Sequence, residues 1–255
     1  MSTASLSPAV PEMNQQPGLS EPQRIINVFT SPSKTFADIR RNSRWWVPFL
    51  LSSIFAYVLV FTVGQKVGWE QVTENQMKLN PKAVERMDQL SPEARARQMN
   101  LAVTITKVIS YAIPVVVLLI DLLIAAVLMA TFNFGVGTEI TFGQSLAIVM
   151  YAGVVGIVKS SLAVITLLAG SNVEAFNFSN PVGTNPAYYM SVVDTPAWLY
   201  RMCSWFDILT IWVFVLMGIG FAVVGRKKIS TGIAVMAGWF IALVLLTTGW
   251  VAITS

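Results

Sequence analysis

The 255-residue sequence contains no histidine and a single cysteine, Cys203. Without a second cysteine, the chain cannot form an internal disulfide. The missing histidine also excludes Cys–His catalytic pairs and Ser–His–Asp triads, and metal sites built from histidine and cysteine are excluded with them. We therefore expect a protein that is not an enzyme, with no catalytic residues, no metal site and no cofactor.

Charged residues are scarce as well, at 12% of the chain against 55% hydrophobic residues. A soluble domain carries about 25% charged residues, so this shortage predicts apolar surface that faces lipid. The lipid bilayer is the first expected partner. The net charge of +4 is concentrated beside apolar runs, where basic residues set membrane orientation, and we expect no nucleic-acid partner.

Five apolar runs are each long enough to cross ~30 Å of hydrocarbon at about 1.5 Å per helical residue. They lie near residues 46–65, 104–131, 144–169, 204–225 and 229–253. The predicted fold class is all-α: residues 45–253 form an integral membrane bundle of five transmembrane helices. Ser91-Pro92 is a helix start that should continue without a break into the second span.

Two segments precede the first span. Residues 1–23 are rich in Ser, Pro and Gln and are predicted to be a disordered tail, not a signal peptide. Residues 24–44 mix hydrophobic residues at roughly helical spacing with basic ones, which predicts an amphipathic juxtamembrane segment of two short helices. A soluble linker helix is the alternative. The residues expected at the membrane surface are Arg24, Phe29, Lys34, Phe36, Arg40, Arg41 and Arg44.

The distribution of basic residues predicts the orientation. Residues 24–44 and the turn at 226–228 carry most of the relevant Lys and Arg, and both fall on one side of a five-span protein. Basic loops are cytoplasmic, so we expect the N-terminus inside and the C-terminus outside. The loop at 66–103 also carries Lys and Arg, but acidic residues are interleaved with them.

Three charged residues lie within or at the edge of predicted spans: Asp121, Lys159 and Asp207. The stretch around Lys159 imitates the end of a phosphate-binding loop, but Val158 stands where that loop needs glycine. A charge at the bilayer centre costs about 2.5–3.5 kcal/mol, so each needs a partner, an interface or water. Lys159 lies roughly 22 Å from the cytoplasmic edge and Asp207 roughly 5 Å inside the outer edge, so we expect these two to pair.

This candidate intramembrane polar cluster has two interpretations. In the structural one, the pair fixes how spans three and four pack together. In the functional one, Asp121, Lys159 and Asp207 form a proton or ion relay in a water-filled cleft. Small residues at every fourth position, from Ala152 to Ser160 and from Ala234 to Ala242, predict close helix packing inside the bundle. A homo-oligomer contact is the alternative for these rows.

Four stretches together resemble a known family. They are FTSPSKTFADIR, WWVPFLL, TFGQSLAIVMYAG and FDILTIWVFVLMGIGFAVVGRKK, beginning at residues 29, 45, 141 and 206. They are similar to the bacterial branch of the YIP family, whose eukaryotic members are Rab-interacting membrane proteins of the Golgi and endoplasmic reticulum. The resemblance covers residues 25–250, and its most specific parts are the S-P-S-x-x-F motif at 31–36 and the stretch 207–220.

The resemblance implies five spans, a cytoplasmic N-terminus and a role in membrane organisation or partner binding without known catalysis. We accordingly expect a multi-pass protein of the bacterial cytoplasmic (inner) membrane that binds a protein or lipid partner, in a trafficking-like or organising role. The alternative is a transporter or permease component that uses Lys159, Asp207 and Asp121. A carrier needs these charges to be accessible to water, which separates the two hypotheses.

Overall fold

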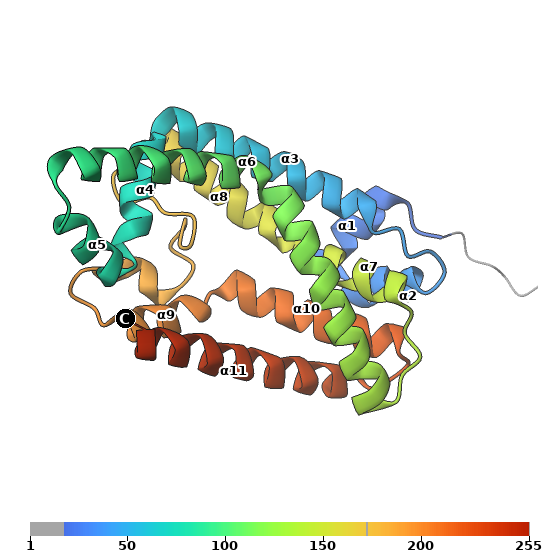
Figure 1. The fold of residues 1–255 in the computed structure, drawn as a ribbon. Coiled ribbons are helices and arrows are strands. Elements are labelled where there is room, and N and C mark those ends of the chain that lie inside the picture. Colours follow the sequence, from blue (N-terminus) through green and yellow to red (C-terminus); the bar gives the residue numbers. More distant parts are fainter. Residues whose placement is uncertain (1–17, 172, 255) are drawn as a thin grey trace, which may run out of the picture.

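The computed structural model describes residues 18–171 and 173–254, so most of the predicted disordered tail lies outside the described residues. Every regular element in these ranges is a helix, and no strand occurs in them (Figure 1). The elements are α1 (Glu21–Thr30), α2 (Pro32–Ile39), α3 (Trp46–Lys66), α4 (Trp69–Lys78), α5 (Pro81–Asp88), α6 (Pro92–Ala130), the π-helical turn η1 (Thr131–Val136), α7 (Phe142–Gly153), α8 (Val155–Leu168), the 3-10 turn η2 (Pro186–Tyr189), α9 (Ala197–Trp205), α10 (Ile208–Val224) and α11 (Ile229–Thr254).

The helices are long and apolar enough for a membrane protein. In the described part of the chain, four candidate spans meet this standard: α3, α6 with η1, α7 with α8, and α11. A fifth is formed if α9 and α10 count as one span that bends by 51°. The fold is therefore the predicted all-α membrane bundle, with one of its spans broken.

Helix α6 begins as the sequence predicted. The Ser91 side chain accepts a hydrogen bond from the Ala94 backbone N–H at 3.3 Å, and the helix then runs for 39 residues with Pro114 inside it. A transmembrane helix tolerates an internal proline where neighbouring helices or Ser and Thr side chains satisfy the backbone groups that the proline leaves unpaired. After η1 the chain turns at Gly137, whose φ of 69° is left-handed and suits glycine.

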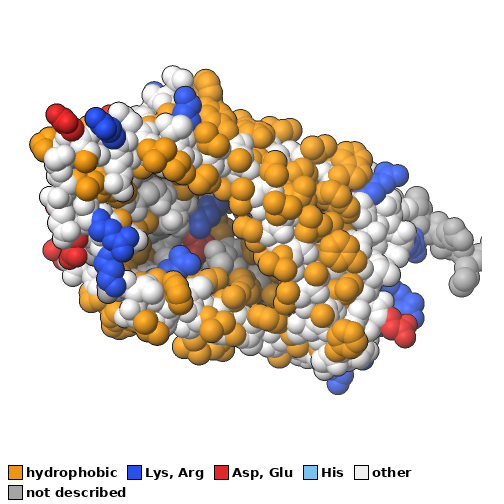
Figure 2. Space-filling view, in the orientation of Figure 1, with side chains coloured by type: hydrophobic (Ala, Val, Ile, Leu, Met, Phe, Trp, Pro, Cys, Tyr) orange, Lys and Arg blue, Asp and Glu red, His pale blue; other side chains and the backbone are white. Residues whose placement is uncertain are grey.

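The two ends of the bundle differ in what they contain. Figure 1 shows α1 and α2 at one end, beside the turn between α10 and α11, and α4, α5, α9 and the C-terminus at the other. One hydrophobic core surrounds α7, in which every residue from Ser145 to Ala152 is buried. A second core joins α3, α4, α8 and the loop after α8. The broad face in Figure 2 is hydrophobic, as a lipid-facing surface requires.

The close helix contact lies elsewhere than predicted. A Cβ atom at Gly218 of α10 would lie 2.9 Å from the Ile233 Cα of α11, so the backbones touch there. Within the described residues, nothing lies within 4 Å of a Cβ built on Gly156 or Gly238. The prediction that these two glycines let helices approach inside the bundle is therefore wrong, because their helix faces point outward.

Candidate functional site

Lys159 and Asp207 form the predicted ion pair. The Lys159 Nζ lies 3.0 Å from the Asp207 Oδ2, which joins α8 to the start of α10. The carboxylate is 1% exposed and the lysine side chain 27%. The depth estimate from the sequence thus identified the correct partner for the lysine.

Asp207 lies at the break between α9 and α10, where it is the N-cap residue of α10. Its Oδ1 accepts hydrogen bonds from the backbone N–H groups of Leu209 and Thr210 at 2.9 and 3.0 Å. An N-cap carboxylate satisfies free backbone donors and lies at the positive end of the helix dipole. The carboxylate therefore has a structural role of its own, independent of Lys159.

The loop before α9 supplies two further donors to the other oxygen. Thr184 Oγ1 donates to Asp207 Oδ2 at 2.6 Å, and Asn185 Nδ2 lies 3.4 Å from the same atom. Asn185 Nδ2 also donates to Asn180 Oδ1 at 2.7 Å. The sequence did not predict a role for Asn180, Thr184 or Asn185. The Asn-Pro steps at 180–181 and 185–186 indicated turns only, and no motif pointed to Thr184.

Asp121 does not join this cluster. It lies on α6, half-buried, and among the residues that the structure describes no hydrogen bond or ion pair links it to Lys159 or Asp207. Tyr151 of α7, eight residues before Lys159, is fully buried and bonded to the N-terminal segment. Figure 2 does show Lys or Arg and Asp or Glu side chains inside a hollow of the bundle.

A second polar cluster fixes the N-terminal segment to the bundle. Arg24 is 2% exposed and binds Asp38 through Nε and Nη2, at 2.8 and 2.6 Å from Oδ2. Its guanidinium carbon lies 6.0 Å from the centre of the Tyr151 ring, and the Tyr151 hydroxyl donates to Glu21 Oε2 at 2.5 Å. Burial lowers the pKa of Arg24, but hydrogen bonding to Tyr151 and Asp38 outweighs it and raises that pKa above the usual arginine value.

An apolar contact reinforces this attachment. Phe36 of α2 is fully buried, and its ring lies where a side chain at Gly220 of α10 would be. A Cβ at that glycine would come within 3.0 Å of the Phe36 ring and 2.6 Å of Ile148 Cγ2. The two stretches that carried the family resemblance most specifically are therefore in contact.

The Yip1 domain family matches residues 26–251, a range that runs from α1 to α11 and includes both polar clusters except Glu21 and Arg24. The chain belongs to the Yip1 domain family. The membrane protein YknW of Bacillus subtilis strain 168 is 26% identical over 230 residues, which are 89% of this chain and 86% of the relative. No solved structure matches the chain.

In this Yip1 domain, the N-terminal hairpin (residues 21–44) differs from the prediction at two positions. Arg24 and Phe36 were expected at the membrane surface, but both are buried because they fix the hairpin to α7 and α10. Phe29 is 42% exposed. Four more of the expected surface residues are exposed, namely Lys34, Arg40, Arg41 and Arg44. Their contact with a membrane surface remains a prediction.

Proposed function

We propose that this protein is a non-catalytic multi-pass membrane protein that binds a protein or lipid partner, and that the N-terminal hairpin is its binding surface. One observation carries the proposal. The hairpin is held in place by the buried residues Arg24 and Phe36, while its other basic side chains, together with Ile26 and Phe29, are exposed. A surface that is fixed before binding loses less entropy when a partner associates.

The charge of this surface follows from where its acids lie. Glu21 and Asp38 are the only acidic residues in 18–44. Asp38 is buried against Arg24, and Glu21 accepts the Tyr151 hydrogen bond. Lys34, Arg40 and Arg44 are exposed, with Arg44 4.0 Å from Glu21, so positive charge predominates on this surface and would attract an anionic partner.

The same surface has an apolar part. Ile26 and Phe29, three residues apart on α1, are 60% and 42% exposed, whereas Arg24 and Val28 face the bundle. Exposed aromatic and aliphatic side chains beside basic ones suit either an acidic amphipathic protein segment or the headgroup region of an anionic membrane. We infer a role in membrane organisation or trafficking-like assembly from this combination and from the family.

We further propose that the protein lies in a bacterial cytoplasmic membrane with this hairpin on the cytoplasmic side. The basic turn at residues 226–228 is exposed and lies at the same end of the bundle as α1 and α2 (Figure 1). Basic residues near span ends favour the cytoplasmic side. The relative in Bacillus subtilis is a bacterial membrane protein, which supports the compartment.

Site-specific photocrosslinking tests the binding surface. A photoreactive amino acid is placed at Phe29 in the full-length chain in native membranes, and at the 67% exposed Leu245 of α11 as a control. We expect a discrete adduct at position 29, of either protein or anionic phospholipid mass, that differs from the bulk-lipid adducts formed at the lipid-facing position 245. Identical adducts at the two positions, or none at position 29, would refute the hairpin as the binding surface.

Transport is the second candidate, and one observation favours it. The Lys159 side chain keeps 27% exposure beside a buried carboxylate, in a bundle whose face is hollowed (Figure 2). Against it, Asp207 already receives two backbone and two loop hydrogen bonds besides the lysine, so structural partners hold the carboxylate in position. A proton relay needs groups that exchange partners.

A further inference from the structure

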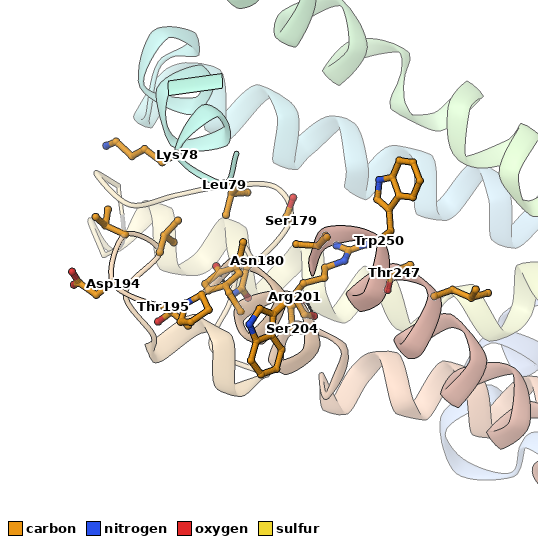
Figure 3. Close-up of a pocket in the computed structure, with 18 residues that line it drawn as sticks. Lys78, Leu79, Ser179, Asn180, Asp194, Thr195, Arg201, Ser204, Thr247 and Trp250 are labelled. Atoms are coloured by element: carbon orange, nitrogen blue, oxygen red, sulfur yellow. Dashed lines mark hydrogen bonds between the residues drawn. The ribbon is translucent and has the colours of Figure 1, made fainter. Parts of the chain in front are cut away.

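A cavity of about 1020 Å³ lies at the end of the bundle opposite the N-terminal hairpin. Its walls come from α9, α11, the end of α4 and the loop between α8 and α9 (Figure 3). Residues Asn180, Tyr200, Arg201, Thr247 and Trp250 are among those that line it. The volume is at the upper end of the range for small-molecule sites, which is about 300–1,000 Å³.

One wall of the cavity is held in place by the Asp207 cluster. Asn180 accepts a hydrogen bond from Asn185 at 2.7 Å, and Asn185 in turn contacts Asp207. Asn180 Nδ2 reaches the Tyr200 hydroxyl at 3.3 Å, and its backbone N–H donates to Asn177 Oδ1 at 2.8 Å. The loop wall is thus formed before any ligand arrives, as pre-organised sites are.

Two basic residues line the cavity. Lys78 donates to Asn75 Oδ1 at 3.4 Å and points away from the cavity in Figure 3, whereas Arg201 faces it. Arg201 extends from α9 toward Thr247 and Trp250 of α11, and its guanidinium carbon lies 5.9 Å from the Trp205 ring centre (Figure 3). No ion pair with an acidic residue involves Arg201 in residues 18–171 and 173–254. Asp194 also lines the cavity, but it accepts a hydrogen bond from Ser191 at 2.7 Å and points away in Figure 3. The cation therefore faces the cavity without an anion of its own.

The cavity lies at the height where lipid headgroups are found. Trp250 is 21 residues beyond the start of α11, so it lies ~32 Å along that helix, about one hydrocarbon thickness. Trp198 and Trp250 are 43% and 70% exposed, and tryptophans favour the membrane interface. Leu246, 68% exposed on α11, extends the apolar wall toward the lipid-facing side.

We propose that this cavity binds an anionic phospholipid of the surrounding bilayer, with the phosphate at Arg201 and the start of an acyl chain beside Leu246 and Trp250. A guanidinium binds phosphate through paired, charge-assisted hydrogen bonds. The mixed lining suits a molecule with a charged head and an apolar chain. This site is separate from the N-terminal hairpin and does not depend on its function.

Native mass spectrometry of the purified full-length protein tests the assignment. Phosphatidylglycerol and phosphatidylcholine are added at equal concentration, and the lipid-bound fraction is measured for the original chain and three variants. Arg201→Gln removes the proposed phosphate contact, and Ser204→Phe fills the cavity from α9. Arg86→Gln is the matched control, because Arg86 is exposed on α5 at the same end of the bundle.

We expect the original chain to retain phosphatidylglycerol over phosphatidylcholine. Arg201→Gln should weaken phosphatidylglycerol retention about tenfold, the effect of losing a charge-assisted hydrogen bond. Ser204→Phe should reduce retention of both lipids, and Arg86→Gln should change neither. Equal retention of the two lipids, or equal losses for Arg201→Gln and Arg86→Gln, would overturn the proposal. Displacement of the lipid by millimolar inorganic phosphate would assign the site to a free anion instead.

Discussion

The ring of Phe36 occupies the space that a side chain at Gly220 would need. This contact joins the short helix α2 to the last turns of α10, so the N-terminal hairpin is part of the folded core and not a flexible arm on its surface. Phe36, Ile148 and Phe221 belong to the same hydrophobic cluster. The position of the proposed binding surface therefore depends on packing inside the membrane domain.

Substitution of Gly220 should be costly for this reason. Gly220→Ala places a methyl group 2.6 Å from Ile148 Cγ2 and 3.0 Å from the Phe36 ring, and such overpacking costs about 1–3 kcal/mol. Gly238→Ala is the matched control, since its Cβ meets nothing within 4 Å and alanine favours a helix. In thermal unfolding in detergent, we expect the first variant to be less stable and the second unchanged or more stable. Equal behaviour would mean that Phe36 does not dock at Gly220.

The Lys159–Asp207 pair should behave as a coupled unit. Lys159→Met leaves the carboxylate with its backbone and loop donors, and Asp207→Asn keeps an N-cap but leaves the lysine without its anion. Removing one partner of a fully buried pair costs about 3–5 kcal/mol, and we expect less here because Lys159 is 27% exposed.

The double variant Lys159→Met with Asp207→Asn should recover part of that loss in the same unfolding measurement. Recovery follows because neither charge is then left alone, and residues in contact typically show coupling of about 0.5–3 kcal/mol. Recovery should be incomplete, because Thr184 loses its charged acceptor. Strictly additive losses would show that the two side chains do not interact, contrary to the structure.

Asp38→Asn should loosen the N-terminal hairpin selectively. Asp38 accepts both short hydrogen bonds of Arg24, which is 2% exposed, whereas the other carboxylate near Arg24, that of Glu21, lies 3.5 Å away. Hydrogen exchange of the full-length protein should show faster exchange for residues 21–39 while α8 and α11 keep their protection. The exposed residue Arg40, changed to Gln, is the control and should leave exchange unaltered. Uniform acceleration over all helices would contradict a local role for the pair.

The orientation can be measured by cysteine labelling in intact cells, in a background with Cys203 replaced by serine. Ser33 on α2 and Gln89 after α5 are exposed and lie at opposite ends of the bundle. A membrane-impermeant reagent should label a cysteine at 89 directly and a cysteine at 33 only after permeabilisation. Labelling at 33 in intact cells would reverse the proposed orientation.

The helices and the Lys159–Asp207 pair could be predicted from the sequence. Long apolar runs and the Ser-Pro cap at 91–92 are local signals, and the high cost of charge in lipid made a partner for Lys159 necessary. The depth of a residue along its helix depends only on residue count, so Asp207 could be identified as that partner. Asp121 could not be separated from the pair until the packing of α6 was known.

The remaining contacts depend on tertiary structure that periodicity does not encode. Arg24 and Phe36 fit an amphipathic pattern whether they face lipid or protein, and the pattern does not say which. The bend at Asp207 and the loop residues Thr184 and Asn185 come together only because the chain folds back between α8 and α9. Gly156 and Gly238 were predicted to lie at close helix contacts for a similar reason. Their spacing shows which residues share a helix face, but not which helix, if any, packs against that face.

We propose that the docked hairpin binds a partner, whereas the Lys159–Asp207 pair supports the fold. The most direct measurement is the yield of the photocrosslinked adduct at position 29 in two variants of the full-length protein. We expect Asp38→Asn to lose most of the adduct, because the hairpin is no longer held, and the double variant Lys159→Met with Asp207→Asn to retain it. Loss of the adduct in a folded double variant, together with its retention in Asp38→Asn, would rule out the hairpin as the binding surface and place function at the ion pair.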